Sequence, residues 1–466
     1  MSNRDLAFLG ISELGRLFRA RKLSPAELTQ LFLARIDQRN PELNAYLTLT
    51  PDLALAQARQ AEKELFAPRS SKSRRDRGPL HGIPISLKDN IHTLGIRTTA
   101  GAKFLKDFVP EKDAQLVMQL KKAGAVILGK TNLHEFAYGV TSNNPHYGPT
   151  RNPWDTARIP GGSSGGAAAA VAAGLCIAAI GTDTGGSIRI PASLCGVVGF
   201  KPALHSVSMD GIIPLSTTLD CAGPLARSVE DAALLLEAIH ARGKSSLSKA
   251  TAKRKFTVGI PNEFFFDALS SETQNVFESA LKTLRRVGCK IKEISIPLLN
   301  NTESAGNNVA WVEATHYHQK MGWFPKHSAD YGEDVRARLE IGTRVTAITY
   351  LEAMEQREAF VQQFHSALAE DKVDALVVPT TPIAAPLIGE ESTTLHGKDY
   401  ATRALLLRLN RPANLAGIPA ISIPCGLTLS GLPLGLQFIG PASSESVLLS
   451  IAHLFERARP FPVLPK

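Results

Sequence analysis

Two serines in this sequence stand in glycine-rich settings that suit acyl-transfer chemistry. Ser163 lies within GGSSGG, and Ser187 lies within GTDTGGSIR. Glycine lets the backbone adopt positive φ and lets another molecule approach closely. A serine in such a turn can expose its hydroxyl among backbone N–H groups, which suits attack on a carbonyl and binding of the resulting oxyanion. Both segments are therefore candidates for a catalytic site.

A serine nucleophile needs a base, and Lys88 is the candidate. It follows the largely apolar run 83–87, which predicts a strand with Lys88 at its half-buried end. Burial lowers the pKa of a lysine, so that its neutral form can accept a proton. For an isolated lysine, a solvated position on a strand edge would be the more ordinary interpretation.

The chain around the serines argues against a flexible linker, the usual meaning of a Gly/Ser cluster. Residues 167–173 predict a short helix and residues 175–180 a buried strand, so GGSSGG adjoins structured chain. The apolar stretch 165–181 is shorter than the ~20 residues that a membrane span requires. We therefore expect a buried site and no membrane segment.

Five motifs occur in a characteristic order and spacing: HGIPISLKDN, GKTNLHEFAYG, RNPWDTARIPGGSSGG, GTDTGGSIRIPA and GVVGFKP. In these motifs the chain resembles the amidase signature family of serine hydrolases. The resemblance is dense over residues 80–225 and looser over 373–455. It implies an α/β fold with a large mixed β-sheet core covered by helices on both faces.

The resemblance also implies a role for each matching position. Ser187 would be the nucleophile, Ser163 would relay protons after a cis peptide bond, and Lys88 would be the base. Asp183 and Arg189 would support the loop as an ion pair. The family implies no metal and no cofactor. The oxyanion hole would consist of the backbone N–H groups of Thr184, Gly185, Gly186 and Ser187.

Other motifs are rejected on their context. GAVILGKT, at 124–131, fits the P-loop pattern, but its four middle residues are apolar and predict the strand itself. GGSSGG contains the nucleophile-elbow pattern, but the preceding TARIP is no strand and no histidine has a distinguishing setting. His316 and His318 are two residues apart and cannot share a helical face. The pair His134–Glu135 is interpreted as structural packing beside the site.

The resemblance leaves two kinds of amide open. Stand-alone amidases often take apolar or aryl amides, whereas the glutaminase subunit of aspartyl/glutamyl-tRNA amidotransferase hydrolyses glutamine and passes ammonia to a partner subunit. Arg357 stands where that branch places an arginine for the glutamine carboxylate, and a surface-helix role is the alternative. The acidic residue with which that branch binds glutamine is missing from this sequence, because Leu407 occupies the nearest equivalent position. We expect a stand-alone amidase acting on a small-molecule amide; the alternative is the glutamine-hydrolysing subunit.

Composition fits a globular protein of 466 residues, with 44% hydrophobic and 20% charged residues. The net charge of +9 suggests binding to nucleic acid. Much of this charge, however, lies in segments 70–78 and 241–255, which are interpreted as solvated loops. An inactive RNA-binding or scaffold relative is a further alternative, opposed by the retention of all three catalytic positions. Five cysteines without paired spacing and the lack of a signal peptide indicate a cytoplasmic protein.

We expect a single amidase domain over 1–466. Residues 1–65 would form an N-terminal helical layer, and residues 66–240 the catalytic signature core. Residues 241–372 would form an inserted strand–helix–strand and helical region, and residues 373–466 the C-terminal part of the core. Helices are predicted at 12–20, 24–38, 51–65, 115–123, 272–287, 347–369 and 445–458. Further strands are predicted at 125–128, 256–260, 290–296, 375–378, 419–424 and 434–439.

Overall fold

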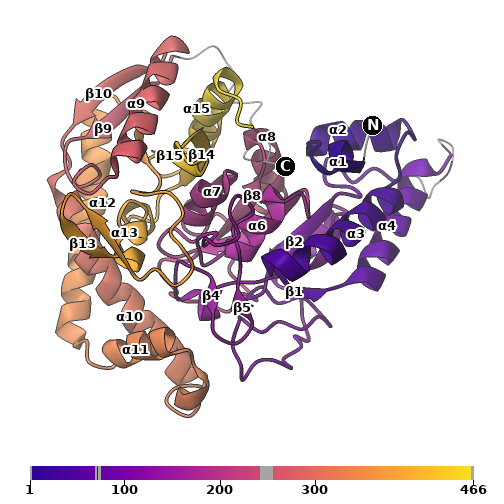
Figure 1. Cartoon of the computed structure of the whole chain (residues 1–466), viewed down its shortest axis with the longest axis horizontal. Helices are drawn as coiled ribbons and strands as arrows, with labels where there is room; N and C mark the ends of the chain where they lie inside the picture. The colour runs from indigo at the N-terminus through magenta and orange to yellow at the C-terminus, as the bar shows by residue number, and fades with distance from the viewer. Residues whose placement is uncertain (1–2, 69–70, 72–74, 242–254, 463–466) are drawn as a thin grey trace.

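An 11-stranded mixed sheet forms the centre of the structure, a computed structural model that describes residues 3–68, 71, 75–241 and 255–462 (Figure 1). Strand β2 is parallel to β3 and β6, and β9 is parallel to β10 and β11, whereas the other neighbours are antiparallel. In sheet order the strands are β1 (Tyr46–Leu49), β3 (Val126–Thr131), β2 (Pro84–Lys88), β6 (Ala178–Asp183), β8 (Cys221–Ala226), β7 (Val198–Lys201), β14 (Ala420–Leu427), β15 (Pro433–Ile439), β11 (Ala375–Pro379), β9 (Thr257–Pro261) and β10 (Lys290–Ile294).

Helices flank this sheet, which confirms the predicted α/β fold class. They are α1 (Asn3–Ala7), α2 (Ile11–Arg19), α3 (Pro25–Leu43), α4 (Pro51–Phe66), α5 (Gln115–Lys122), α6 (Gly165–Ala172), α7 (Arg189–Cys195), α8 (Val229–Ile239), α9 (Ser271–Arg286), α10 (Thr302–Lys320), α11 (Glu333–Gly342), α12 (Ala347–Glu370), α13 (Thr402–Arg408), α14 (Arg411–Leu415) and α15 (Glu445–Ala458). Short 3₁₀ turns are η1 (Glu135–Ala137), η3 (Pro297–Asn301) and η4 (Ser328–Asp330). Two hairpins, β4 (Asn143–Asn144) with β5 (Gly148–Pro149) and β12 (Ser392–Leu395) with β13 (Lys398–Ala401), lie outside the main sheet.

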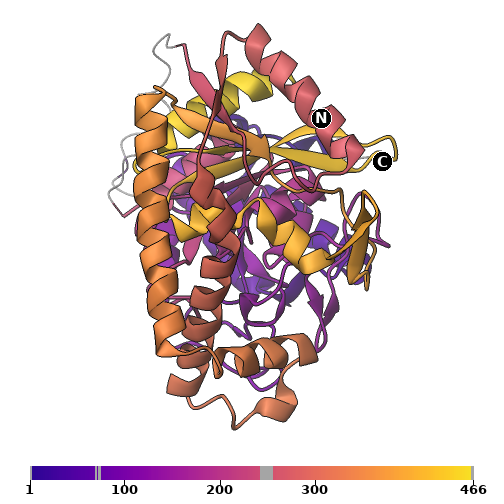
Figure 2. The ribbon, with the colours of Figure 1, turned by 90° about the vertical axis from the view of Figure 1, so that its left-hand side faces the viewer.

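The two ends of the sheet carry different helices. Helices α1–α4 gather beside β1 and β2 at one end, and α9 lies with β9 and β10 at the other (Figure 1). The long helix α12 packs along α10 on one side of the molecule (Figure 2). Between the ends, α6 and α7 pack on each other and on the central strands, which α8 and α15 also contact. The candidate catalytic segments therefore lie at the middle of the sheet, next to α6 and α7.

The predicted helices agree with the structure where capping signals are strong. Helix α3 begins after Ser24, whose hydroxyl accepts a hydrogen bond from the Glu27 N–H, while the Glu27 carboxylate accepts one from the Ser24 N–H. This reciprocal capping box confirms the predicted start of the helix. The strand–helix–strand unit predicted in region 241–372 is also present as β9, α9 and β10. It extends the central sheet, because β9 pairs with β11.

Two central strands, β7 and β8, are absent from the sequence prediction. Strand β8 reads CAGPLA, whose glycine and proline are typical of turns. All six residues are nevertheless buried, and Pro224 lies opposite Ile180 of β6. Burial on both faces therefore overrides the local propensity here.

In the part of the chain that the structure describes, no helix combines the length and apolarity needed to cross a bilayer. All five cysteines are buried as free thiols. The basic segment 242–254 and most of 69–74 lie outside the described residues. Arg77, at the end of the first basic segment, forms two hydrogen bonds with the Glu64 carboxylate.

Candidate active site

Two parallel strands bring the predicted base and nucleophile to the same edge of the sheet. Lys88 ends β2, and the turn that carries Ser187 follows β6 directly. Leu87 of β2 pairs with Ile180 of β6, so both chains leave the sheet in the same direction. The carboxyl ends of adjacent parallel strands are a common place for a ligand site.

Lys88 is fully buried at this edge and contacts the predicted relay serine. Its Nζ lies 2.7 Å from Ser163 Oγ and 2.7 Å from Thr182 Oγ1. Burial lowers the pKa of Lys88 to about 7, although the negative charges of Asp220 and Asp183 raise it. A substantial fraction of Lys88 is therefore neutral near pH 7, and its lone pair can accept the Ser163 proton.

The segment that carries Ser163 is fixed from several sides. The Gly162–Ser163 peptide bond is cis, as the resemblance implied. The Ser163 carbonyl accepts a hydrogen bond from the His134 N–H at 3.2 Å. The N–H of the next residue, Ser164, donates to the Ser187 carbonyl at 3.1 Å, which joins the two serine segments directly. All three predicted catalytic residues are therefore gathered at one edge of the sheet.

A buried ion pair shapes the turn around Ser187. Arg189 donates from Nη2 to Asp183 Oδ1 at 2.9 Å and from Nε to Oδ2 at 3.1 Å. The Asp183 carboxylate also accepts the N–H groups of Gly186, at 2.8 Å, and Ile188, at 3.0 Å. Burial alone would raise the pKa of Asp183, but Arg189 holds it well below its usual range. The carboxylate therefore stays charged and organises the turn.

The same contacts engage one of the predicted oxyanion donors, the Gly186 N–H. Thr184, Gly185 and Ser187 line a small cavity. Gly186 is not among the lining residues, and its N–H donates to Asp183 Oδ1 at 2.8 Å. The Gly186 N–H is therefore already engaged, and the N–H groups of Thr184, Gly185 and Ser187 stay the predicted donors to an oxyanion.

Asp220 supports this turn, and the sequence analysis did not predict it as a site residue. Its Oδ1 accepts the Thr184 hydroxyl at 2.5 Å, and its Oδ2 accepts the N–H groups of Leu215 and Ser216. Burial raises the pKa of Asp220 to about 6. The available signal was its position at the end of GIIPLSTTLD, a segment that also supplies Leu215 to the cavity.

Replacing Gly186 by alanine should displace the turn. Gly186 has φ of +122°, and an added Cβ would lie 2.6 Å from Asn410 Cβ. Because a displacement of about 1 Å at a reacting group can cost ~10²-fold in rate, kcat should fall by about that factor. The melting temperature should fall as well. Steady-state kinetics and thermal melting test this expectation.

Gly288→Ala is the matched control for that variant. Gly288 also has positive φ, at +89°, but no atom lies within 4 Å of an added Cβ. It should cost some stability and leave kcat unchanged. An unchanged kcat and melting temperature in Gly186→Ala would contradict the proposed constraint on the turn.

The contacts of Arg357 lie outside the cavity beside Ser187. Its guanidinium donates to Thr218 Oγ1 at 3.0 Å and to the Thr218 carbonyl at 3.1 Å, and it does not line the cavity beside Ser187. Leu407, which stands in place of the glutamine-binding acid, does line that cavity. Arg403 and Arg411 also line it, and neither was predicted from the sequence.

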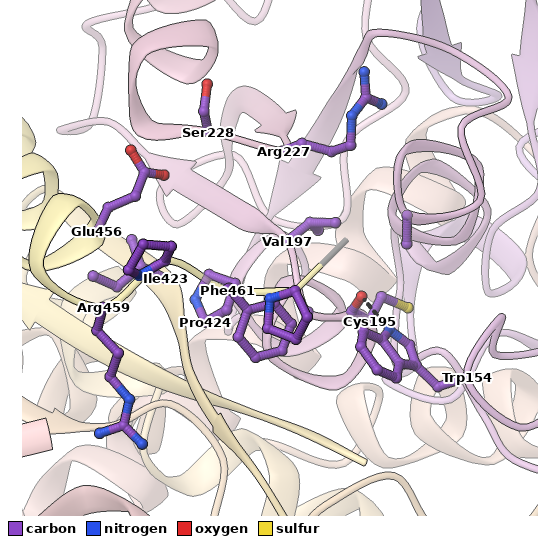
Figure 3. Close-up of a pocket in the computed structure, with 14 residues that line it drawn as sticks. Trp154, Cys195, Val197, Arg227, Ser228, Ile423, Pro424, Glu456, Arg459 and Phe461 are labelled. Carbon is purple, nitrogen blue, oxygen red and sulfur yellow. Dashed lines mark hydrogen bonds between the residues drawn. The ribbon is translucent and has the colours of Figure 1, made fainter. Parts of the chain in front are cut away.

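A second cavity lies around Trp154, Cys195 and Phe461 (Figure 3). The Trp154 Nε1–H donates to the Cys195 carbonyl at 2.9 Å. None of the three predicted catalytic residues lines this cavity. Burial raises the pKa of the Cys195 thiol far above its usual range, so this thiol is a poor nucleophile.

The residues of the other motifs considered in the sequence make contacts within the fold. GAVILGKT contains strand β3, whose buried Lys130 donates from Nζ to the Ile91 carbonyl. His134 contacts Asp334 at 2.9 Å, and Glu135 contacts His146 at 3.0 Å, as expected of structural packing. Among the described residues, no group of three or more His, Cys, Asp or Glu side chains is arranged to hold a metal ion.

A known amidotransferase subunit and a known amidase resemble this chain in sequence and in fold. The chain is 36% identical to a glutamyl-tRNA(Gln) amidotransferase subunit, the one designated A, of Carboxydothermus hydrogenoformans, with 98% of each chain covered. A solved amidase structure matches with a TM-score of 0.89 and 35% identity over 96% of this chain and 99% of that chain. The solved structure of the same amidotransferase subunit from Thermotoga maritima gives a TM-score of 0.79 and 35% identity over 98% of both chains. Since the Amidase family model also matches residues 27–449, the chain belongs to the amidase signature family.

Proposed function

We propose that this protein hydrolyses a carboxylic amide through a covalent acyl-enzyme on Ser187. The contact of Lys88 Nζ with Ser163 Oγ at 2.7 Å is the observation that carries the proposal. It couples a buried, partly neutral amine to a hydroxyl whose segment is hydrogen-bonded to the Ser187 turn. A serine between a base and a nucleophile can pass a proton in either direction.

In the proposed acylation, Ser187 Oγ attacks the amide carbonyl. Its proton passes to Ser163 and the Ser163 proton passes to Lys88 Nζ. The N–H groups of Thr184, Gly185 and Ser187 stabilise the oxyanion, and one such donor is typically worth ~10²–10³-fold in rate. The C–N bond then breaks as the leaving nitrogen takes a proton back along the same relay. Water enters, loses a proton to the relay and releases the acid from Ser187.

The substrate has two candidate assignments. The curated relatives include these amidotransferase subunits at 36–38% identity, which favours glutamine over the general amide that the sequence alone led us to expect. Those relatives are named as subunits, so this assignment also implies partner chains. The cavity lining favours an amide without an ammonium group, because Leu407 stands beside the Ser187 turn and no acidic residue is among the described lining.

Ammonia release from glutamine and from glutaramate separates these assignments. Glutaramate is glutamine without its α-ammonium group, so the pair isolates recognition of that charge. A glutamine-hydrolysing subunit should prefer glutamine by at least tenfold, with or without amidotransferase partner subunits. We expect the chain by itself to show no such preference, and Leu407→Asp to shift the ratio toward glutamine. A strong glutamine preference in the unmodified chain would overturn our assignment in favour of the subunit.

A further inference from the structure

Two arginines border the cavity beside Ser187 without a carboxylate partner. Arg403 lies in α13 and Arg411 begins α14. Among the described residues neither guanidinium forms an ion pair, and Arg403 Nε is buried without a hydrogen-bond partner. Arg411 is only 5% exposed. A buried charge without a counter-ion is unfavourable, so this arrangement indicates a place for an anion.

The negative charges of Asp334 and Glu303 act on Arg403 and Arg411 respectively, but both carboxylates form their ion pairs with other arginines. Asp334 accepts a hydrogen bond from Arg338 at 2.8 Å, and Glu303 pairs with Arg408 at 3.3 Å. Burial and the positive charges of neighbouring arginines lower the pKa of Arg403 to about 9. Arg403 nevertheless remains a cation at neutral pH. The described lining of the cavity therefore contains two cationic side chains and no acidic one.

Tyr138 also lines this cavity. The Tyr138 hydroxyl is buried and has no hydrogen-bond partner among the described residues. Phe136 and Ala137 precede it with φ of 49° and 59°, left-handed values that fix the path of this segment. The Arg338 guanidinium lies 5.5 Å from the centroid of the Tyr138 ring. An unpartnered hydroxyl beside two unpaired cations can donate to an anionic oxygen.

Arg411 lies close to the reacting turn. A Cβ added at Gly185 would lie 3.7 Å from Arg411 Nη2 and 3.0 Å from Leu407 Cδ2. An anion bound by Arg411 would therefore lie only a few bonds from a carbonyl held at this turn. The remaining described lining includes the apolar side chains of Val140, Leu215, Ala310 and Leu407.

We propose that Arg403, Arg411 and Tyr138 form a carboxylate-binding subsite, and that the substrate is an amide bearing a carboxylate a few methylene groups from the scissile carbonyl. This inference rests on the proposed function, since it takes Ser187 as the nucleophile. A guanidinium presents paired N–H donors that match the two oxygens of a carboxylate. The apolar side chains suit a short methylene chain.

The test compares glutaramate with pentanamide, which carries a methyl group in place of the carboxylate. We expect kcat/KM for glutaramate to exceed that for pentanamide by about 10²-fold or more, because a site built from polar groups rejects an analogue that leaves them unpaired. In Arg411→Met and Arg403→Met this ratio should fall toward one. The melting temperature of Arg411→Met should be unchanged or higher, since methionine keeps the apolar stem and removes an unpaired buried charge.

Arg336→Met is the matched control. Arg336 is a surface arginine on α11 that pairs with Glu340 at 3.8 Å and does not line the cavity. It should keep the glutaramate preference. A second measurement does not depend on turnover: glutarate should protect Ser187 from an uncharged fluorophosphonate in the wild type and not in Arg411→Met.

The two levels of the proposal fail in different ways. If pentanamide is hydrolysed as well as glutaramate, or glutarate gives no protection, the carboxylate subsite is wrong while the acyl-enzyme mechanism stands. If Ser187 is not labelled and no amide is hydrolysed, the proposed function itself is wrong. A ratio that survives in both arginine variants would also overturn the subsite.

Discussion

Ser187→Ala should lower kcat for amide hydrolysis by about 10⁴–10⁶-fold, the range expected when a member of a serine catalytic unit is removed. The reason is that no acyl-enzyme can form without the Ser187 hydroxyl. Residual turnover would come from the oxyanion donors and from binding alone. Ammonia release under saturating substrate, with long incubation times, measures the loss.

Ser193→Ala is the control for this variant. Ser193 lies on α7, six residues after Ser187, and its hydroxyl contacts Thr381 Oγ1 at 2.9 Å outside the catalytic cavity. It should retain most of the activity. Both variants should give far-ultraviolet circular dichroism like that of the wild type. Ser187→Ala turnover within tenfold of wild type would contradict the assignment of the nucleophile.

Lys88→Met should lower kcat by about 10²–10⁴-fold, the usual contribution of a positioned general base. Lys88→Arg should be equally damaging, because a guanidinium stays protonated and cannot accept the Ser163 proton. In the wild type, burial lowers the pKa of Lys88 to about 7. The active, neutral form therefore accumulates as pH rises through 7, so kcat/KM should rise with pH below 7 and level off above it.

The Asp220→Asn variant should shift this pH profile in a defined direction. The negative charge of Asp220 raises the pKa of Lys88, so its removal should move the acid limb of the profile to lower pH. Asparagine keeps an oxygen that can accept the Thr184 hydroxyl, but its amide nitrogen cannot accept the N–H groups of Leu215 and Ser216, so thermal melting should accompany the pH profile. A profile that is flat between pH 5 and 9 in the wild type would contradict Lys88 as the base.

The candidate catalytic residues could be predicted because each lies in a short motif with a recognisable spacing. Lys88 ends an apolar run, and Ser163 and Ser187 stand among glycines. Asp183 and Arg189 lie six residues apart around the same turn, so local sequence contains both partners of their ion pair. Motifs of this kind carry their own geometry.

The cavity lining could not be predicted in the same way. Tyr138 and Arg411 come from segments more than 200 residues apart, and only the fold brings them together. Their lack of partners is a property of the three-dimensional surroundings. Arg357 is the opposite case, because it was named from its position in the sequence. In the structure Arg357 contacts Thr218, whereas other arginines line the cavity.

The fold shows the same division. The helices α3, α12 and α15 follow periodic apolar patterns and begin close to their predicted positions. Strand β8 contains a glycine and a proline and becomes a strand only because two neighbouring strands pair with it. The edge strand β1 is four residues long, too short for a periodic signal.

Mass spectrometry of the protein after reaction with a fluorophosphonate tests the central claim most directly. We expect one phosphonylated peptide, which carries the adduct on Ser187, and a much slower reaction in Lys88→Met because the relay activates this hydroxyl. Prior modification should abolish amide hydrolysis in proportion to labelling. An adduct on a different serine, or full amidase activity in protein labelled at Ser187, would contradict the account.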